Sequence, residues 1–250
     1  MSTLSICSIC QDEGEVIGAF LESCVHTLSV LRDDLREVIL VDGGSKDNTL
    51  DVISSYKDRL PLILLERSFD SFGQQKNIAL EEASGDFIWG PDTDMTWTTN
   101  FPEMFKQGYF DVEAFWNFPI VFTADDAWHY FYQWPTNINV RLWKRGPKFV
   151  SYYHEQPEGS LKGSTPLCQD VWMFENSCRQ SDAALWNRGR RYQKFAVQMA
   201  EAGGGPGPED RYVNAAQQST TQKQLLPHAI LKMVLPSTNF QGRPDWKEHP

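Results

Sequence analysis

Apolar and polar positions follow two different periods along about the first ninety residues. Four short β-rich runs are LSICSIC (4–10), EVILVD (37–42), LPLILLE (60–66) and DFIWG (86–90). The segments between them are predicted to be helices: EVIGAFLESCVHTL (15–28), DNTLDVISSY (47–56) and QQKNIALEEA (74–83). Ser45 or Asp47 is available to cap the second helix. Strands that alternate with helices predict an α/β domain with a parallel sheet covered on both faces.

Polar residues gather where three of these strands end. QDE (11–13) follows the first strand, DGGSKD (42–47) the second and DTD (92–94) the fourth. Parallel α/β sheets bind ligands at the carboxyl ends of their strands. The topology brings these three segments to one edge, where we expect the functional site.

The pattern becomes aromatic-rich and irregular from about Trp97. Most aromatic residues are expected in the core, and four could also form stacking platforms for a ligand: Trp116, Trp128, Trp134 and Tyr153. Residues 184–202 predict a basic amphipathic helix, with arginines that we expect to be solvated rather than to close over an anionic ligand: Arg188, Arg190 and Arg191. A flexible GGGPGPED segment follows, then one helix around QKQLLPHAILKMV (222–234) and a polar tail.

Charge restricts the ligands that the chain attracts. The 250 residues carry a formal net charge of −10, which opposes binding to nucleic acids and anionic membranes. An anionic substrate would need local cations, backbone N–H groups or a metal. No apolar run approaches the roughly 18 residues of a membrane span, and MSTLSICSIC lacks the basic region of a secretory signal. We therefore expect a cytoplasmic protein with no nucleic-acid partner and no transmembrane segment.

Cysteine and glycine motifs exclude several other classes. The five cysteines fit buried reduced thiols better than a disulfide framework. Cys7 and Cys10 form a C-x-x-C pair, but residues three apart on a strand point to opposite faces, which argues against a zinc or redox site. CQDEGEV, the turn after the first strand, has neither G-x-G-x-x-G nor G-x-x-x-x-G-K-[ST]. The sequence therefore disfavours dinucleotide enzymes and P-loop NTPases.

An ordered set of motifs resembles family 2 glycosyltransferases of the GT-A fold, in their soluble single-domain branch. The set is SICQDEGEVIGAFLESC, VILVDGGSKDNTLDVI, QQKNIALEEASGDFIWGPDTDMTW and VRLWKRG…YYHE, and it extends from residue 4 to about 155. The resemblance implies a Rossmann-like, mostly parallel central sheet flanked by helices, with a helical C-terminal extension. It also implies a nucleotide-sugar-binding half (1–97), an acceptor-binding half (98–202) and the extension (203–250).

The resemblance further implies a metal-dependent, inverting transfer of a sugar. The donor would be a UDP- or GDP-sugar, and the acceptor a hydroxyl of a glycan, a lipid-linked molecule or a protein. The leaving diphosphate needs stabilisation, which Mn²⁺ or Mg²⁺ held by carboxylates supplies in an acidic protein. Asp92 and Asp94 are the expected carboxylates, and Asp92 also faces the donor; the alternative is a solvated turn. Pro91 replaces a residue that is usually apolar and not proline in the family, so the resemblance does not fix the residue at which this strand ends.

Four residues are expected to bind the nucleotide part of the donor. By resemblance, Asp42 contacts the base or ribose, and Asp12 and Glu13 seat the nucleoside. Lys76 stands where the family usually has arginine, and would neutralise diphosphate as a point charge. The alternatives are a tight D-G-G turn for Asp42 and a solvated helix face for Lys76.

The resemblance makes Glu155, in YYHE, the first choice for the base that deprotonates the acceptor hydroxyl. His154 beside it would be a metal or phosphate ligand, although the pair could also be a surface feature. Asp125, Asp126 and Asp170 compete as bases. Rival functions are a nucleotidyltransferase, which should have a glycine-rich basic loop after the first strand, and a non-catalytic nucleotide-sugar or glycan-binding relative.

Overall fold

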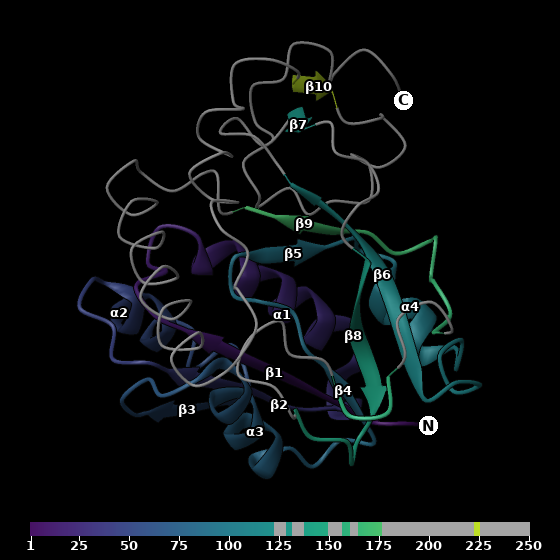
Figure 1. Cartoon of the computed structure of the whole chain (residues 1–250), viewed down its shortest axis with the longest axis horizontal. Helices are drawn as coiled ribbons and strands as arrows, with labels where there is room; N and C mark the ends of the chain where they lie inside the picture. Colours follow the sequence, from purple (N-terminus) through teal and green to yellow (C-terminus); the bar gives the residue numbers. More distant parts are fainter. Residues whose placement is uncertain (123–128, 132–137, 150–156, 161–164, 177–222, 226–250) are drawn as a thin grey trace, which may run out of the picture.

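The computed structural model describes residues 1–122, 129–131, 138–149, 157–160, 165–176 and 223–225. Four strands of these ranges form the parallel half of an eight-stranded sheet, and they are joined in the order β3-β2-β1-β4 (Figure 1). Their bounds are β1 (Leu4–Cys10), β2 (Leu35–Asp42), β3 (Leu62–Glu66) and β4 (Phe87–Trp89). The four predicted strands are confirmed. Cys10 pairs with Asp42, and Asp42 with Glu66, so the carboxyl ends of β1, β2 and β3 lie level.

The second half of the sheet is mixed and continues from β4 in the order β8-β6-β9-β5. Only β6 and β9 run parallel there, while β4–β8, β8–β6 and β9–β5 are antiparallel pairs. The bounds are β5 (Met95–Trp97), β6 (Phe115–Phe122), β8 (Ile138–Lys144) and β9 (Met173–Glu175). Through β8, this half brings Ile138–Lys144 alongside β4, the strand that the DTD segment follows.

A separate two-stranded sheet pairs β7 (His129–Phe131) with β10 (Lys223–Leu225) in antiparallel fashion. The predicted helix around residues 222–234 is therefore wrong at Lys223–Leu225. The three residues have good helix propensity, but pairing with a strand far away in the sequence overrides that weak local preference. The rest of that segment lies outside the described residues, as does the basic segment 184–202.

Helices cover both faces of the sheet, as the alternating pattern predicts. One core cluster contains side chains from α1 (Ile17–Leu31), α2 (Thr49–Ser54) and α4 (Phe101–Lys106), whereas the other contains side chains from α3 (Phe72–Glu82). A short 3₁₀ turn, η1 (Arg32–Asp34), links α1 to β2. None of the described helices has the length and apolar character needed to span a bilayer.

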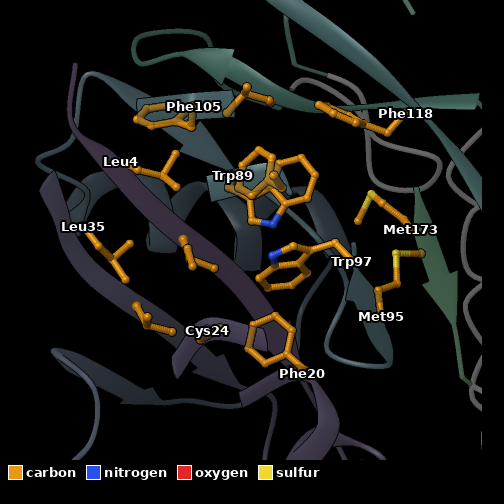
Figure 2. Packing of buried hydrophobic residues seen from close by; sticks show 14 of the residues in the cluster. Leu4, Phe20, Cys24, Leu35, Trp89, Met95, Trp97, Phe105, Phe118 and Met173 are labelled. Carbon is orange, nitrogen blue, oxygen red and sulfur yellow. The ribbon is translucent and has the colours of Figure 1, made fainter. Parts of the chain in front are cut away.

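The larger core cluster is built around Trp89 of β4, which has no exposed surface (Figure 2). Its ring stacks on Phe101 at a centroid distance of 4.2 Å and meets Trp97 and Phe118 edge-on. Trp116 is also buried, and its indole N–H donates to the Phe110 carbonyl at 3.1 Å. Trp116 is therefore a core residue, in agreement with the expectation for most of the aromatic residues.

The C-x-x-C pair is divided between the two faces of the sheet. Cys7 belongs to the cluster that includes α3, and Cys10 to the cluster that includes α1. Burial raises the pKa of both thiols well above the ordinary value, so neither is a ready nucleophile or metal ligand. The prediction that the two side chains point to opposite faces of the strand is confirmed.

A buried carboxylate joins three segments near the amino end of β1. Glu37 accepts hydrogen bonds from the Ser5 hydroxyl and from the backbone N–H and hydroxyl of Ser84, the latter two at 2.8 Å. We expect Glu37→Ala to lower the free energy of unfolding by about 2 kcal/mol, because these donors lose their acceptor. Urea denaturation measures the loss. Glu66→Ala, at the exposed end of β3, is the matched control, with an expected change within about 0.5 kcal/mol; equal values for the two variants would contradict the prediction.

Candidate functional site at the carboxyl edge of the sheet

The loops after β1 and β2 are locked together by backbone and side-chain hydrogen bonds. The Asp12 N–H donates to the Ser45 hydroxyl at 2.9 Å, and the Lys46 N–H donates to the Asp12 carboxylate at 2.7 Å. The N–H of Glu13, a residue 8% exposed, donates to the Thr49 hydroxyl at 2.8 Å. The structure therefore brings Asp12 and Glu13 beside the second loop, as the topology predicts.

The Asp42 carboxylate organises the turn that follows β2. It accepts from the N–H groups of Gly44 and Ser45 at 2.8 and 2.9 Å, and from the Ser45 hydroxyl. Gly44 has a φ of 92°, a conformation that favours glycine. The tight-turn interpretation of Asp42 is thus confirmed, and its contact with a nucleotide stays a prediction.

Neither residue predicted to cap α2 occupies the N-cap: that position is Asn48, which makes no side-chain cap hydrogen bond, and Asp47 precedes it. Asp47 accepts from the Thr49 N–H at 2.9 Å and from the Gly14 N–H at 3.0 Å, while Ser45 is engaged with Asp42. Burial acts to raise the pKa of Asp47, but these hydrogen bonds outweigh it and lower the pKa below the ordinary value. Asp47 therefore ties the loop after β1 to the first turn of α2.

The segment after β4 is fixed against β1. The Ser8 hydroxyl donates to the Pro91 carbonyl at 2.5 Å, and the Thr93 hydroxyl donates to the Ile9 carbonyl at 3.2 Å. The Gly90 N–H still donates to the Arg141 carbonyl of β8 at 2.8 Å. Strand pairing therefore continues to Gly90, and buried Pro91, which has no N–H to donate, ends it.

Two cations face the Asp92 carboxylate at this point. Lys76 Nζ of α3 lies 3.2 Å from Oδ1, and Arg141 Nη2 of β8 lies 2.7 Å from Oδ2. Burial alone would raise the pKa of Asp92, but Arg141 and Lys76 outweigh it and hold the pKa well below the ordinary value. The cluster Lys76–Asp92–Arg141 is thus net positive at the edge of a strongly acidic protein.

Asp94 lies in the same turn as Asp92, because the Met95 N–H donates to the Asp92 carbonyl at 2.9 Å. Asp94 is buried, with 3% of the whole residue exposed, whereas the side chain of Asp92 is 34% exposed. The backbone carbonyl of Asp94 accepts from the Asn176 N–H at 2.8 Å, which ties this turn to the segment after β9. Both predicted carboxylates are therefore brought to the candidate site, one near the surface and one beneath it.

Asp92 and Asp94 offer carboxylate oxygens, the kind of ligand that suits a hard divalent cation. Mg²⁺ and Mn²⁺ prefer oxygen ligands, and a carboxylate has about four lone-pair positions, of which the ion pairs of Asp92 with Lys76 and Arg141 occupy two. The described residues contain no group of three or more His, Cys, Asp or Glu side chains that could hold a metal. The coordination positions of the cation that the two carboxylates do not fill would be taken by phosphate oxygens and water.

Several predicted residues lie outside the described ranges, so their placement stays a prediction. They are Asp125, Asp126, Trp128, Trp134, Tyr153, His154, Glu155, Arg188, Arg190 and Arg191. Asp170 is described and exposed, and its backbone carbonyl accepts from the Asn100 side chain at 2.8 Å. Arg141 is the residue that sequence reasoning missed; the available signal was a charged side chain within the apolar strand VRLW.

The chain was compared with known protein families and with curated proteins. The family described as glycosyl transferase family 2 matches residues 5–155. The poly(ribitol-phosphate) beta-N-acetylglucosaminyltransferase TarS of Staphylococcus aureus is 37% identical over 60 residues, which are 23% of this chain and 10% of TarS. The chain thus matches only about a tenth of the length of this curated relative.

Solved structures extend the comparison to the fold. The crystal structure of S. aureus TarS 1-349 aligns with 22% identity and a TM-score of 0.41 over 49% of this chain and 36% of that one. Mannosyltransferase PcManGT from Pyrobaculum calidifontis, in complex with GDP-Man and Mn²⁺, aligns with 17% identity and a TM-score of 0.53 over 87% and 69%. The latter supports the GT-A fold, with its largely parallel, curled sheet. By the match over residues 5–155, the chain belongs to glycosyl transferase family 2.

Proposed function

We propose that this protein transfers a sugar from a nucleoside-diphosphate sugar to an acceptor hydroxyl with the help of a divalent cation. The observation that carries the proposal is the Lys76–Asp92–Arg141 cluster, which lies at the carboxyl edge of the sheet beside the locked loops of β1 and β2. An acidic chain needs local cations to bind a diphosphate, and this cluster supplies them where α/β sheets bind ligands.

The order of the strands suggests how the bound donor would be oriented. β1 lies between β2 and β4, so a nucleoside at the Asp42 turn would extend its diphosphate across the end of β1 toward Asp92. Asp12 and Glu13 would border the nucleoside, and Lys76 would contact the diphosphate. The donor class agrees with the GDP-Man bound to the mannosyltransferase and the UDP-GlcNAc bound to TarS.

Asp92 and Asp94 would hold Mn²⁺ or Mg²⁺. When bound, the cation neutralises the negative charge that grows on the leaving diphosphate. Arg141 and Lys76 hold the pKa of Asp92 below its ordinary value, which favours the ionised form that binds a cation. The mannosyltransferase structure contains Mn²⁺, the cation class that these carboxylates suit.

We further propose an inverting reaction in which Glu155 takes the proton of the acceptor hydroxyl and His154 serves as a metal or phosphate ligand. Glu155→Gln is expected to lower kcat about 10³-fold, because the amide cannot accept that proton. Calorimetry with UDP or GDP should give the wild-type affinity, which separates catalysis from binding. Asp170→Asn, which removes an exposed competing base, is the control. Full turnover in Glu155→Gln would move the role to Asp125, Asp126 or Asp170.

A donor panel tests the proposed function. UDP- and GDP-sugars are incubated with the protein and with glycan, lipid-linked and protein acceptors, and release of nucleoside diphosphate is measured with Mn²⁺, with Mg²⁺ and with EDTA. We expect release with at least one donor and its loss in EDTA. Release of pyrophosphate from a nucleoside triphosphate would instead support a nucleotidyltransferase.

A further inference from the structure

We propose that Arg141 is a positioning residue of the donor site, which fixes the Asp92 carboxylate from the protein side and leaves its outer side to the donor. This inference rests on the proposed function. Arg141 comes from β8, about fifty residues after Asp92, and lies next to it only because β8 pairs antiparallel with β4. The guanidinium side chain is 9% exposed and the carboxylate 34% exposed, so the cation lies beneath the anion.

Arg141 holds the strand end through its backbone and its side chain together. Its carbonyl accepts from the Gly90 N–H at 2.8 Å, and its Nη1 donates to the Gly90 carbonyl at 3.0 Å. Nη2 of the same group donates to Asp92 Oδ2 at 2.7 Å. A planar fork of this kind fixes a carbonyl and a carboxylate two residues apart in one relative orientation, which an ammonium group cannot do.

The neighbouring packing leaves the strand end little room to shift. A Cβ placed on Gly90 would lie 2.6 Å from Cη2 of Trp143, whose side chain is 1% exposed on the same strand as Arg141. The backbone at Gly90 is therefore pressed against β8. Arg141 thus acts at a closely packed strand end, the kind of support that a positioning residue requires.

Lys76 has a different task at the same carboxylate. It reaches Oδ1 at 3.2 Å, the longer of the two ion pairs, from a flexible stem on α3. An ammonium group on such a stem can turn to a diphosphate without a change in the backbone. Arg141, which is bound to a backbone carbonyl as well, stays in place.

The test is isothermal titration calorimetry, in which UDP or GDP is titrated into the protein with Mn²⁺ and, separately, in EDTA. The proteins compared are wild type, Arg141→Gln, Arg141→Lys, Asp92→Asn and the double variant Arg141→Gln/Asp92→Asn. Arg141→Gln should weaken binding with Mn²⁺ about tenfold, and the double variant should be no weaker than Asp92→Asn, because Arg141 acts through that carboxylate. Arg141→Lys should fall between wild type and Arg141→Gln. Arg145→Gln is the matched control, since Arg145 also donates to a carbonyl of the β4 region, that of Gly85, at the opposite end of the sheet.

The outcomes separate this inference from the proposed function. Losses that add in the double variant, or wild-type affinity in Arg141→Gln, would overturn the positioning role while leaving the donor site intact. Should Arg141→Gln fail to fold, wild-type affinity in Arg141→Lys would overturn it. Absence of nucleotide binding by the wild-type protein, with and without Mn²⁺, would overturn both.

Discussion

Asparagine in place of Asp92 or Asp94 is expected to lower kcat about 10³-fold, because the cation that stabilises the leaving diphosphate loses a charged ligand. Asparagine keeps the volume of the side chain and removes its charge. The two variants should differ in nucleotide binding without metal. Asp92→Asn removes one negative charge from beside Lys76 and Arg141, so we expect affinity for UDP or GDP in EDTA at least as high as in wild type.

The measurement is nucleoside diphosphate release as a function of Mn²⁺ concentration. Asp86→Asn is the matched control, since Asp86 lies at the opposite end of β4, where it accepts from the Thr3 N–H and hydroxyl at 2.9 Å. Its activity should stay within about twofold of wild type. Wild-type turnover in Asp94→Asn, with an unchanged response to EDTA, would contradict the metal site.

Trp89→Ala is expected to lower the free energy of unfolding by about 4 kcal/mol, a large part of the stability of an ordinary domain. Trp89 has no exposed surface and stacks on Phe101. It is in edge contact with Trp97 and Phe118 (Figure 2). The substitution leaves a cavity between β4, α4 and β6. It also loosens the strand whose end positions Asp92, so activity should fall together with stability.

Denaturation in urea, followed by circular dichroism, measures this loss. Trp89→Phe is the graded comparison: it keeps an aromatic ring and removes an indole N–H that has no hydrogen-bond partner among the described residues. Its cost should be about 1–2 kcal/mol. Val112→Ala, at a position 75% exposed, should change little. A loss below about 1 kcal/mol in Trp89→Ala would show that the core is not centred on this residue.

The parallel half of the fold could be predicted because its signals are local. Short β-rich runs and the helical patterns between them predicted β1 to β4 and α1 to α3, and topology then placed Asp12, Asp42 and Asp92 at one edge. The antiparallel half gave no such signal, because its strands pair across long stretches of chain. Lys223–Leu225 has helix-forming residues and is nevertheless a strand, since its partner is almost a hundred residues away.

The carboxylates of the candidate site could be predicted from the sequence, whereas the cation Arg141 could not. Aspartates at strand ends can be read from the chain, whereas the role of Arg141 depends on which strand lies next to β4. Likewise, D-G-G indicated both a turn and a nucleotide contact at Asp42, and the structure supports the turn through the N–H groups of Gly44 and Ser45. Spacing alone cannot tell a residue that supports a loop from one that contacts a ligand.

A crystal structure of the protein with UDP or GDP and Mn²⁺, with anomalous diffraction recorded at the manganese edge, tests the central claim most directly. The account predicts one anomalous peak in contact with Asp92 and Asp94, with the nucleotide lying from the Asp42 turn across the end of β1. A manganese peak away from these aspartates, or a nucleotide bound elsewhere on the molecule, would contradict it.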